Sequence, residues 1–176
     1  MNRTAQDNWN IRLARREDAP AMPAIERAAG TMFERIDGLA GVAGQHTVPV
    51  ERLLRYIARG HCLVAAHETS LIGFIVTEPH GRDLHIWELD VHPDWQGRGV
   101  GSALLRGAMI DARNSGFGAL TLTTFAEVPW NAPFYRRMGF VDIDAANHPR
   151  LADELAREHD QGMPPGSRVA MIRDLA

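Results

Sequence analysis

The feature that most constrains this chain is a glycine-rich turn between a predicted strand and a predicted helix. Residues 87–105 read WELDVHPDWQGRGVGSALL: an apolar segment ends at a His-Pro pair, crosses Gly97, Gly99 and Gly101, and continues into an apolar stretch with helical spacing. Such a turn leaves backbone N–H groups without partners at the start of a helix. Together with the helix dipole, these groups favour an anion. The segment therefore predicts a strand, an anion-binding turn and a helix in direct succession.

Two common nucleotide-binding motifs do not fit this turn. A phosphate-binding loop of the Gly-x4-Gly-Lys-Ser/Thr type needs a lysine, and none follows Gly101. A dinucleotide fingerprint, Gly-x-Gly-x-x-Gly, needs a third glycine where Ser102 stands, and it belongs to an early βαβ unit. The plain structural alternative is a turn whose glycines only allow close packing of the strand on the helix.

Composition limits the class of protein. With 176 residues, 45% apolar and 23% charged, the chain predicts one globular domain over residues 1–176. The net charge of −3 and the lack of a basic run argue against nucleic-acid binding. The single cysteine, Cys62, excludes an internal disulfide and fits a reducing compartment. The apolar runs Cys62–Ala66 and Leu71–Val76 are too short to span a membrane, and the polar start of the chain carries no secretion signal. We expect a cytoplasmic protein.

Hydrophobic periodicity predicts alternating short strands and helices along the chain. The expected strands are Asn10–Ala14, Cys62–Glu68, Leu71–Glu78, Leu84–Val91, Ala119–Phe125, Phe140–Ala145 and Ser167–Arg173. The expected helices are Glu17–Gly30, Val50–Ala58, Ser102–Arg113, Asn131–Met138 and His148–Asp160. Residues 31–49 have weak periodicity and are expected to form a mobile loop with one helical turn. Strands 84–91 and 119–125, joined by a helix, form a βαβ unit and should be parallel.

The glycine turn and its flanks resemble the central motif of the GNAT superfamily of N-acetyltransferases. The resemblance covers Leu89–Leu105, with Gln96-x-x-Gly99-x-Gly101 following a strand that ends in Val-His-Pro. It implies that the backbone amides of residues 98–102 hold the pyrophosphate of acetyl-CoA. Glycine allows the backbone to approach the phosphates, and a β-carbon at Gly99 or Gly101 would push them away.

A second segment carries the same resemblance. Residues 125–140, FAEVPWNAPFYRRMGF, resemble the helix of the family that runs from an asparagine to a tyrosine and ends in a Gly-Phe turn. The resemblance spans residues 10–175 and implies the GNAT fold: an α/β (α+β) mixed sheet of about seven strands, with an antiparallel N-terminal meander, one parallel βαβ unit and flanking helices. The residues that it assigns to the cofactor are Leu89, Val91, Gln96, Arg98, Gly99, Val100, Gly101, Ser102, Asn131 and Tyr135.

Acetyl transfer from a thioester to an amine needs a group that takes the proton of the ammonium and a group that protonates the departing thiolate. Tyr135 matches the second role, because a phenol with a pKa near 10 can donate to a thiol of lower pKa. Glu88 and Asp90 are the candidates for the base. Strand alternation puts these two acids on one face and Trp87 with Leu89 on the other, although members of the family often carry a bulge there. We favour Glu88; Asp90 or an ordered water remains an alternative.

The remaining candidates are weaker. Phe33, Glu34 and Trp130 are expected on the acceptor side, where Glu34 and Asp37 would suit a cationic amine. Arg136 or Arg137 would meet the 3′-phosphate of the cofactor or serve as surface charge. Cys62 has no activating neighbour and is expected in the core, which argues against an acyl-cysteine intermediate. The eight histidines show no metal-ligand spacing, so no metal is expected.

The sequence therefore predicts an acetyl-CoA-dependent N-acetyltransferase, an acyltransferase of the class that transfers groups other than aminoacyl groups. The acetyl group moves to a primary amine of a small molecule or peptide by direct attack in a ternary complex. The alternative is a GNAT-like module that binds acyl-CoA without catalysis. The resemblance also brings the expectation of a homodimer, since dimers are common in the family.

Overall fold

The computed structural model of the chain describes residues 8–41 and 47–175. It contains one sheet of seven strands in the order β1-β2-β3-β4-β5-β7-β6. The strands are β1 (Trp9–Leu13), β2 (Leu63–His67), β3 (Ser70–His80), β4 (Asp83–Val91), β5 (Ala119–Phe125), β6 (Val141–Ile143) and β7 (Arg168–Asp174). The helices are α1 (Met22–Gly30), α2 (Val50–Ala58), α3 (Val100–Asn114), α4 (Ala132–Arg137) and α5 (Pro149–Asp160). The predicted mixed sheet of seven strands is confirmed.

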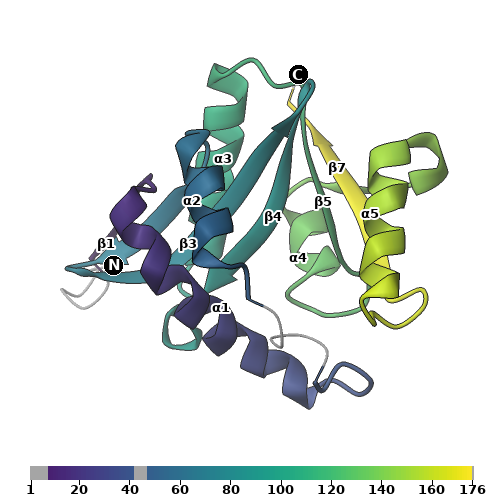
Figure 1. The fold of residues 1–176 in the computed structure, drawn as a ribbon, viewed down its shortest axis with the longest axis horizontal. Helices are drawn as coiled ribbons and strands as arrows, with labels where there is room; N and C mark the ends of the chain where they lie inside the picture. Colours follow the sequence, from purple (N-terminus) through teal and green to yellow (C-terminus); the bar gives the residue numbers. More distant parts are fainter. Residues whose placement is uncertain (1–7, 42–46, 176) are drawn as a thin grey trace.

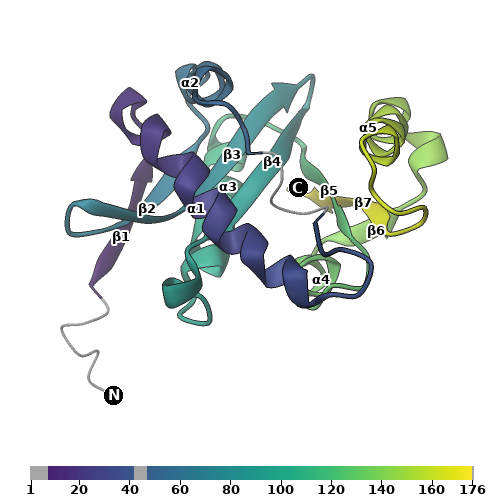
Figure 2. The ribbon, with the colours of Figure 1, turned by 60° about the horizontal axis from the view of Figure 1, so that its bottom comes forward.

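The helices cover both faces of the sheet. In Figures 1 and 2, α1, α2 and α5 lie on one face, and α3 and α4 lie on the other. The larger core cluster lies between the sheet and α3 and includes the fully buried Leu104 and Leu105. A second core cluster joins α1 and α2 to β2 and β3 through Met22, Leu53 and Phe74. The sheet is therefore held from two sides, as a three-layer α/β arrangement requires.

β4 and β5 form the only parallel pair among the strands described, and they separate along their length. Only Asp83–His85 of β4 pairs with 119–121 of β5, although β4 continues to Val91 and β5 to Phe125. Figure 1 shows the two strands meeting near the C-terminus of the chain and diverging from there. The carboxyl ends of both strands thus flank a fork in the sheet, a place where α/β folds bind ligands.

A bulge changes which residues of β4 share a face. Val76 of β3 pairs with Glu88, but the next residue of β3 pairs with Ile86, so Trp87 is an extra residue on β4. Trp87 packs into the cluster under α1 and α2, whereas Leu89 packs into the cluster under α3. The prediction that Trp87 and Leu89 share a face is therefore wrong, because one inserted residue reverses the alternation of the strand beyond it.

Two predicted boundaries also differ. Residues 16–21 form a 3-10 helix before α1, and Gly30 does not end the helical path, because its φ of −59° is helical and a 3-10 helix follows over Thr31–Arg35. The predicted loop over 31–49 therefore starts with this short helix, and part of it, residues 42–46, lies outside the described residues. The predicted strand 140–145 is shorter, since Ala145–Asn147 form a 3-10 turn. Within the described ranges, no helix combines the length and apolarity needed to cross a membrane.

Candidate active site

The turn after β4 is held by its own side chains. A 3-10 helix over Pro93–Trp95 leads out of the strand, and the His92 ring accepts a hydrogen bond from the Asp94 N–H at its start. The Gln96 amide donates to the Val91 carbonyl at 2.9 Å. Gly97 and Gly99 then take φ values of +71° and +84°, in the left-handed region that favours glycine. The glycines are thus required by the backbone path itself.

The start of α3 offers free backbone donors. The first hydrogen bond within this helix joins the Ala103 N–H to the Gly99 carbonyl, and no side chain caps the helix. The N–H groups of Val100, Gly101 and Ser102 precede that bond, so the helix gives them no partner. They form a cluster of donors that suits an anion such as a phosphate group.

A cavity of about 600 Å³ begins at this turn and extends along the fork between β4 and β5. It brings together most of the residues predicted from the sequence. Eleven of them line it: Phe33, Leu89, Val91, Gln96, Gly99, Val100, Gly101, Ser102, Trp130, Asn131 and Tyr135. Three predicted residues are absent from its lining: Glu34, Glu88 and Arg98. Asp90 and Arg137, which the sequence offered as alternatives, also line it, and further lining residues include Ala29, Met32, Trp95 and Phe134.

Asn131 and Tyr135 lie together on the wall formed by α4. Asn131 donates through Nδ2 to the Thr124 hydroxyl at 2.8 Å, while its Oδ1 is buried without a hydrogen-bond partner. Tyr135 is only 8% exposed, and its hydroxyl makes no hydrogen bond within the described part of the chain. Burial raises the pKa of Tyr135, and the nearby carboxyl groups of Asp90 and Glu88 raise it further. The phenol therefore keeps its proton and can act as a donor.

The carboxyl groups at the end of β4 are also perturbed. Asp90 lines the cavity, and its Oδ2 is buried without a hydrogen-bond partner. Burial, together with repulsion from Glu26, raises the pKa of Asp90 to about 8. Burial, Asp90 and Glu26 likewise raise the pKa of Glu88 well above its usual range. A carboxyl with such a pKa can take a proton near neutral pH.

The sequence analysis did not assign a role to Glu26. It lies on α1, is buried, and its Oε2 accepts the Val48 N–H at 2.9 Å. Burial raises its pKa to about 7. A signal was present, because Glu26 occupies a position of the apolar stripe of α1, four residues after Met22 and three before Ala29. A charged residue in that stripe must face the interior of the protein.

Aromatic rings form the wall on the α1 side of the fork. The centroid of the Phe33 ring lies 5.2 Å from that of Phe125 and 5.6 Å from that of Trp130. Phe33 and Trp130, the two rings expected on the acceptor side, both line the cavity. Glu34 and Asp37 are exposed on the outside of this segment, so they do not contribute to its wall.

The remaining candidates are three arginines and one cysteine. Arg98 places its guanidinium 5.1 Å from the centre of the Trp95 ring. Arg136 pairs with Asp142 through two hydrogen bonds of 2.6 and 3.0 Å, whereas Arg137 lines the cavity. Cys62 is buried, and burial raises the pKa of its thiol to about 11, so it is unreactive core as expected.

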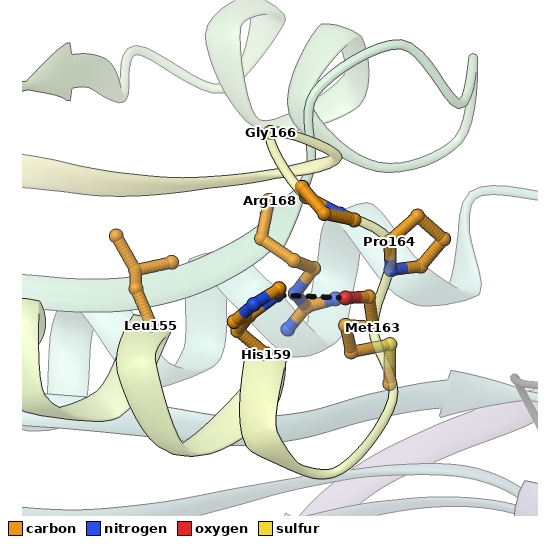
Figure 3. Close-up of a pocket in the computed structure, with 7 residues that line it drawn as sticks. Leu155, His159, Met163, Pro164, Gly166 and Arg168 are labelled. Carbon is orange, nitrogen blue, oxygen red and sulfur yellow. Dashed lines mark hydrogen bonds between the residues drawn. The ribbon is translucent and has the colours of Figure 1, made fainter.

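A smaller cavity of about 240 Å³ lies at the end of α5 (Figure 3). Arg168 borders it, pairs with Glu158 at 2.7 Å, and lies 4.7 Å from the centre of the Phe125 ring. Because Phe125 contacts Phe33, this cavity lies behind the aromatic wall of the larger one. Its lining residues are Leu155, His159, Met163, Pro164, Pro165, Gly166 and Arg168, which include none of the residues predicted for the site.

The fold and the larger cavity are those of an α/β protein with a fork between two parallel strands, and the free amides at one end of the cavity suit an anionic ligand. Residues 58–142 match the family model described as an acetyltransferase (GNAT) domain. This stretch of the chain, just under half of its 176 residues, is therefore similar to the GNAT acetyltransferases. A curated relative, the uncharacterized N-acetyltransferase ycf52 of Porphyra purpurea, is 36% identical over 74 residues, which cover 42% of this chain and 41% of that protein. The match thus spans about two fifths of the relative's length.

Solved structures share the fold over nearly the whole chain. PaiA N-acetyltransferase from Thermoplasma acidophilum, crystallised with coenzyme A, is similar with a TM-score of 0.69 at 19% identity, over 95% of this chain and 99% of that chain. Ribosomal-protein-S18-alanine N-acetyltransferase from Escherichia coli gives 0.69 at 16% identity, over 96% and 95%. N-acetylglutamate synthase from Neisseria gonorrhoeae, crystallised with coenzyme A and N-acetyl-glutamate, gives 0.72 at 20% identity, over 96% of this chain and 35% of that chain.

Proposed function

We propose that the protein is an N-acetyltransferase that moves the acetyl group of acetyl-CoA to a primary amine. The observation that carries this proposal is the cavity that joins the free amides at the start of α3 to the side chains of Asp90 and Tyr135. The match to the GNAT family model and the coenzyme A complexes of two similar proteins support the choice of ligand. The backbone amides at one end of the cavity can bind phosphate groups, and Asp90 with Tyr135 at the other end can exchange protons. This combination suits transfer of a group that is carried by a phosphorylated ligand.

The residues present fit coenzyme A. The N–H groups of Val100, Gly101 and Ser102 would hold the pyrophosphate at the helix start. The buried Asn131 Oδ1, which lacks a donor, would accept an amide N–H of the pantetheine arm. Arg137 is better placed than Arg136 for the 3′-phosphate, because it lines the cavity while Arg136 is engaged by Asp142. The bound ligand supplies the acetyl thioester.

The chemistry assigned to the chain itself is proton transfer at the attacking nitrogen and at the departing sulfur. A carboxylate on β4 takes the proton of the acceptor ammonium, which frees the nitrogen lone pair for attack. Asp90 suits this role better than Glu88, the residue favoured from the sequence, because Asp90 lines the cavity beside Tyr135. Tyr135 donates its proton to the departing sulfur, since its raised pKa keeps the phenol protonated, and the second proton that the nitrogen loses on becoming an amide restores the phenol. Both substrates lie in the site together, so the amine attacks directly.

The test is acetyl transfer to a panel of amines that includes amino acids, peptides with free N-termini, and aliphatic and aromatic amines. Release of coenzyme A would be followed, and products would be identified by mass. Transfer to the enzyme itself gives little background, because the chain contains no lysine. Turnover on at least one amine, lost in Tyr135→Phe, is the expected result. Tight binding of acetyl-CoA without turnover on any amine would instead support a non-catalytic module that binds acyl-CoA.

A further inference from the structure

The closed end of the fork is held by polar side chains. His85 and Thr121 form the last of the three residue pairs between β4 and β5, immediately before the two strands separate. Both residues are buried, with exposed fractions of 1% and 0%. The His85 Nδ1 lies 3.0 Å from the Thr121 hydroxyl oxygen. The two strands are therefore joined by side chains as well as by backbone at the point where the fork begins.

Arg150 of α5 completes this contact. Its Nη2 donates to the Thr121 hydroxyl oxygen at 2.9 Å and lies 3.3 Å from the His85 Nδ1. Because a guanidinium group can only donate, the His85 Nδ1 carries no proton and accepts, and the Thr121 hydroxyl donates to it. Burial and the charge of Arg150 lower the pKa of His85 to about 2, so the ring stays neutral. Together the three residues form a vertex lock between β4, β5 and α5.

The vertex lock connects the two walls of the cavity without lining it. None of its three residues is among those that line the cavity. β4 continues from His85 to Asp90 on one wall, and β5 continues from Thr121 toward α4, which carries Tyr135 on the other. Figure 1 shows α5, the helix of Arg150, beside β5 and β7. Because β4 and β5 diverge from this point, the geometry at the lock sets how far apart the two walls lie.

The lock also contacts the bulge of β4. The His85 ring packs edge-to-face on the Trp87 indole, with ring centroids 4.5 Å apart. The indole N–H donates to the Glu78 carboxylate at 3.0 Å, and the Arg52 guanidinium lies 5.5 Å from the centre of the ring. The extra residue of β4 is thus held on several sides. The lock and the bulge together fix the path of the strand toward Asp90.

A buried apolar contact could also hold the two strands together, but a chain of hydrogen bonds fixes one distance and one orientation. We propose that the vertex lock positions the walls of the cavity for acetyl transfer. It holds β4 and β5 at the separation that brings the Asp90 carboxyl group and the Tyr135 hydroxyl to the same thioester. His85, Thr121 and Arg150 are positioning residues, since they lie outside the cavity lining. This inference rests on the proposed acetyltransferase function and adds residues that set its geometry.

Thr121→Val tests the lock directly. Valine has nearly the shape of threonine and suits a strand, but it lacks the hydroxyl that joins β5 to His85 and Arg150. We expect kcat to fall by about 10- to 100-fold, the cost of a misplaced reacting group. The dissociation constant of acetyl-CoA should stay within about threefold, because the free amides at the start of α3 do not depend on the lock. Thr121→Ser keeps the hydroxyl and should restore kcat.

Thr77→Val is the matched control. Thr77 of β3 is as buried as Thr121, and its hydroxyl donates to the His61 carbonyl at 2.7 Å, away from the fork. The change should cost similar stability and leave kcat unaltered, with kcat expressed per binding site counted by titration with coenzyme A. An equal loss of kcat in Thr77→Val, or no recovery in Thr121→Ser, would reduce the lock to a structural contact and overturn the inference. If Thr121→Val does not fold, Arg150→Met is judged by the same criteria.

Hydrogen exchange separates failure of the inference from failure of the proposed function, because it needs no turnover. We expect the backbone amides of residues 83–85 and 119–121 to exchange at least about tenfold faster in Thr121→Val than in the unaltered protein or in Thr77→Val. If no amine is acetylated, this result would still support the lock in a protein that is not an acetyltransferase. Equal exchange in Thr121→Val and the unaltered protein would overturn the inference, whatever the activity.

Discussion

The two ends of the cavity recognise their ligands in different ways. At the start of α3 the donors are backbone N–H groups, fixed by the helix and by the left-handed Gly99, and they carry no titratable group. At the end of β4 the cavity wall carries the carboxyl group of Asp90, and burial together with repulsion from Glu26 of α1 raises its pKa. The first end is rigid and independent of pH, whereas the second responds to pH and to the charge of its ligand. Binding and chemistry should therefore respond separately to mutation.

The largest expected effect is on the backbone end. Gly101→Val places a branched side chain among the free amides, and loss of two charge-assisted hydrogen bonds to phosphate would weaken acetyl-CoA binding by about 10²- to 10⁴-fold. An added β-carbon itself meets only ordinary contacts, at 3.6 Å from Val91, so the fold should survive. Calorimetric titration with acetyl-CoA measures the change. Ala103→Val, two residues further along α3 and outside the cavity lining, is the control and should bind normally.

A change of the proton donor should affect the chemistry and spare the cofactor. Tyr135→Phe removes only the hydroxyl, which makes no hydrogen bond in the described residues, so the ring keeps its packing on Phe134 and Phe140. We expect kcat to fall by about 100-fold, the lower range for general acid catalysis. The dissociation constant of acetyl-CoA should stay within about threefold. An unchanged kcat in steady-state assays would remove the role assigned to Tyr135.

The base should give the rate its pH dependence. Asp90 must be ionised to take a proton, and its pKa is about 8, so kcat/KM should rise with pH and level off above about pH 8. Asp90→Asn should lower kcat/KM at pH 8 by at least about tenfold, a modest factor because free amine is also present in solution. A pH profile that keeps its inflection in Asp90→Asn, with Glu88→Gln abolishing it, would assign the base to Glu88 instead.

The smallest expected effect is on stability, and its sign is informative. A carboxyl whose pKa rises from 3.8 to about 8 on folding binds more protons in the folded state. The contribution of Asp90 to the stability of the unliganded protein should therefore be most favourable at low pH. It should fall as the pH rises from about 4 to about 8. Glu88→Gln should stabilise the unliganded protein at pH 8 by about 1 kcal/mol, a typical gain where activity demands a strained site. Urea unfolding at pH 5 and pH 8 measures it, and destabilisation at pH 8 contradicts the repulsion described here.

The same comparison explains what the sequence could and could not predict. The backbone end depends on local features, so the glycines, the alternation of β5 and the spacing of α3 were sufficient to predict it. The carboxyl end depends on how distant elements meet. Glu26 and Asp90 are 64 positions apart, and nothing in the local pattern of α1 says which strand it covers. The bulge at Trp87 arises from the pairing of β4 with β3, which alternation along one strand does not reveal.

The extra residue, Trp87, changes which residue numbers of β4 face α3. Before it, even-numbered residues such as Ile86 face α3; after it, odd-numbered residues such as Leu89 do. Deleting Trp87 would leave Glu88, Leu89 and Asp90 on their present faces, because Glu88 would then follow Ile86 directly and the pairing with β3 would become regular. The bulge thus adds an indole to the layer under α1 without changing the faces on which Glu88, Leu89 and Asp90 lie.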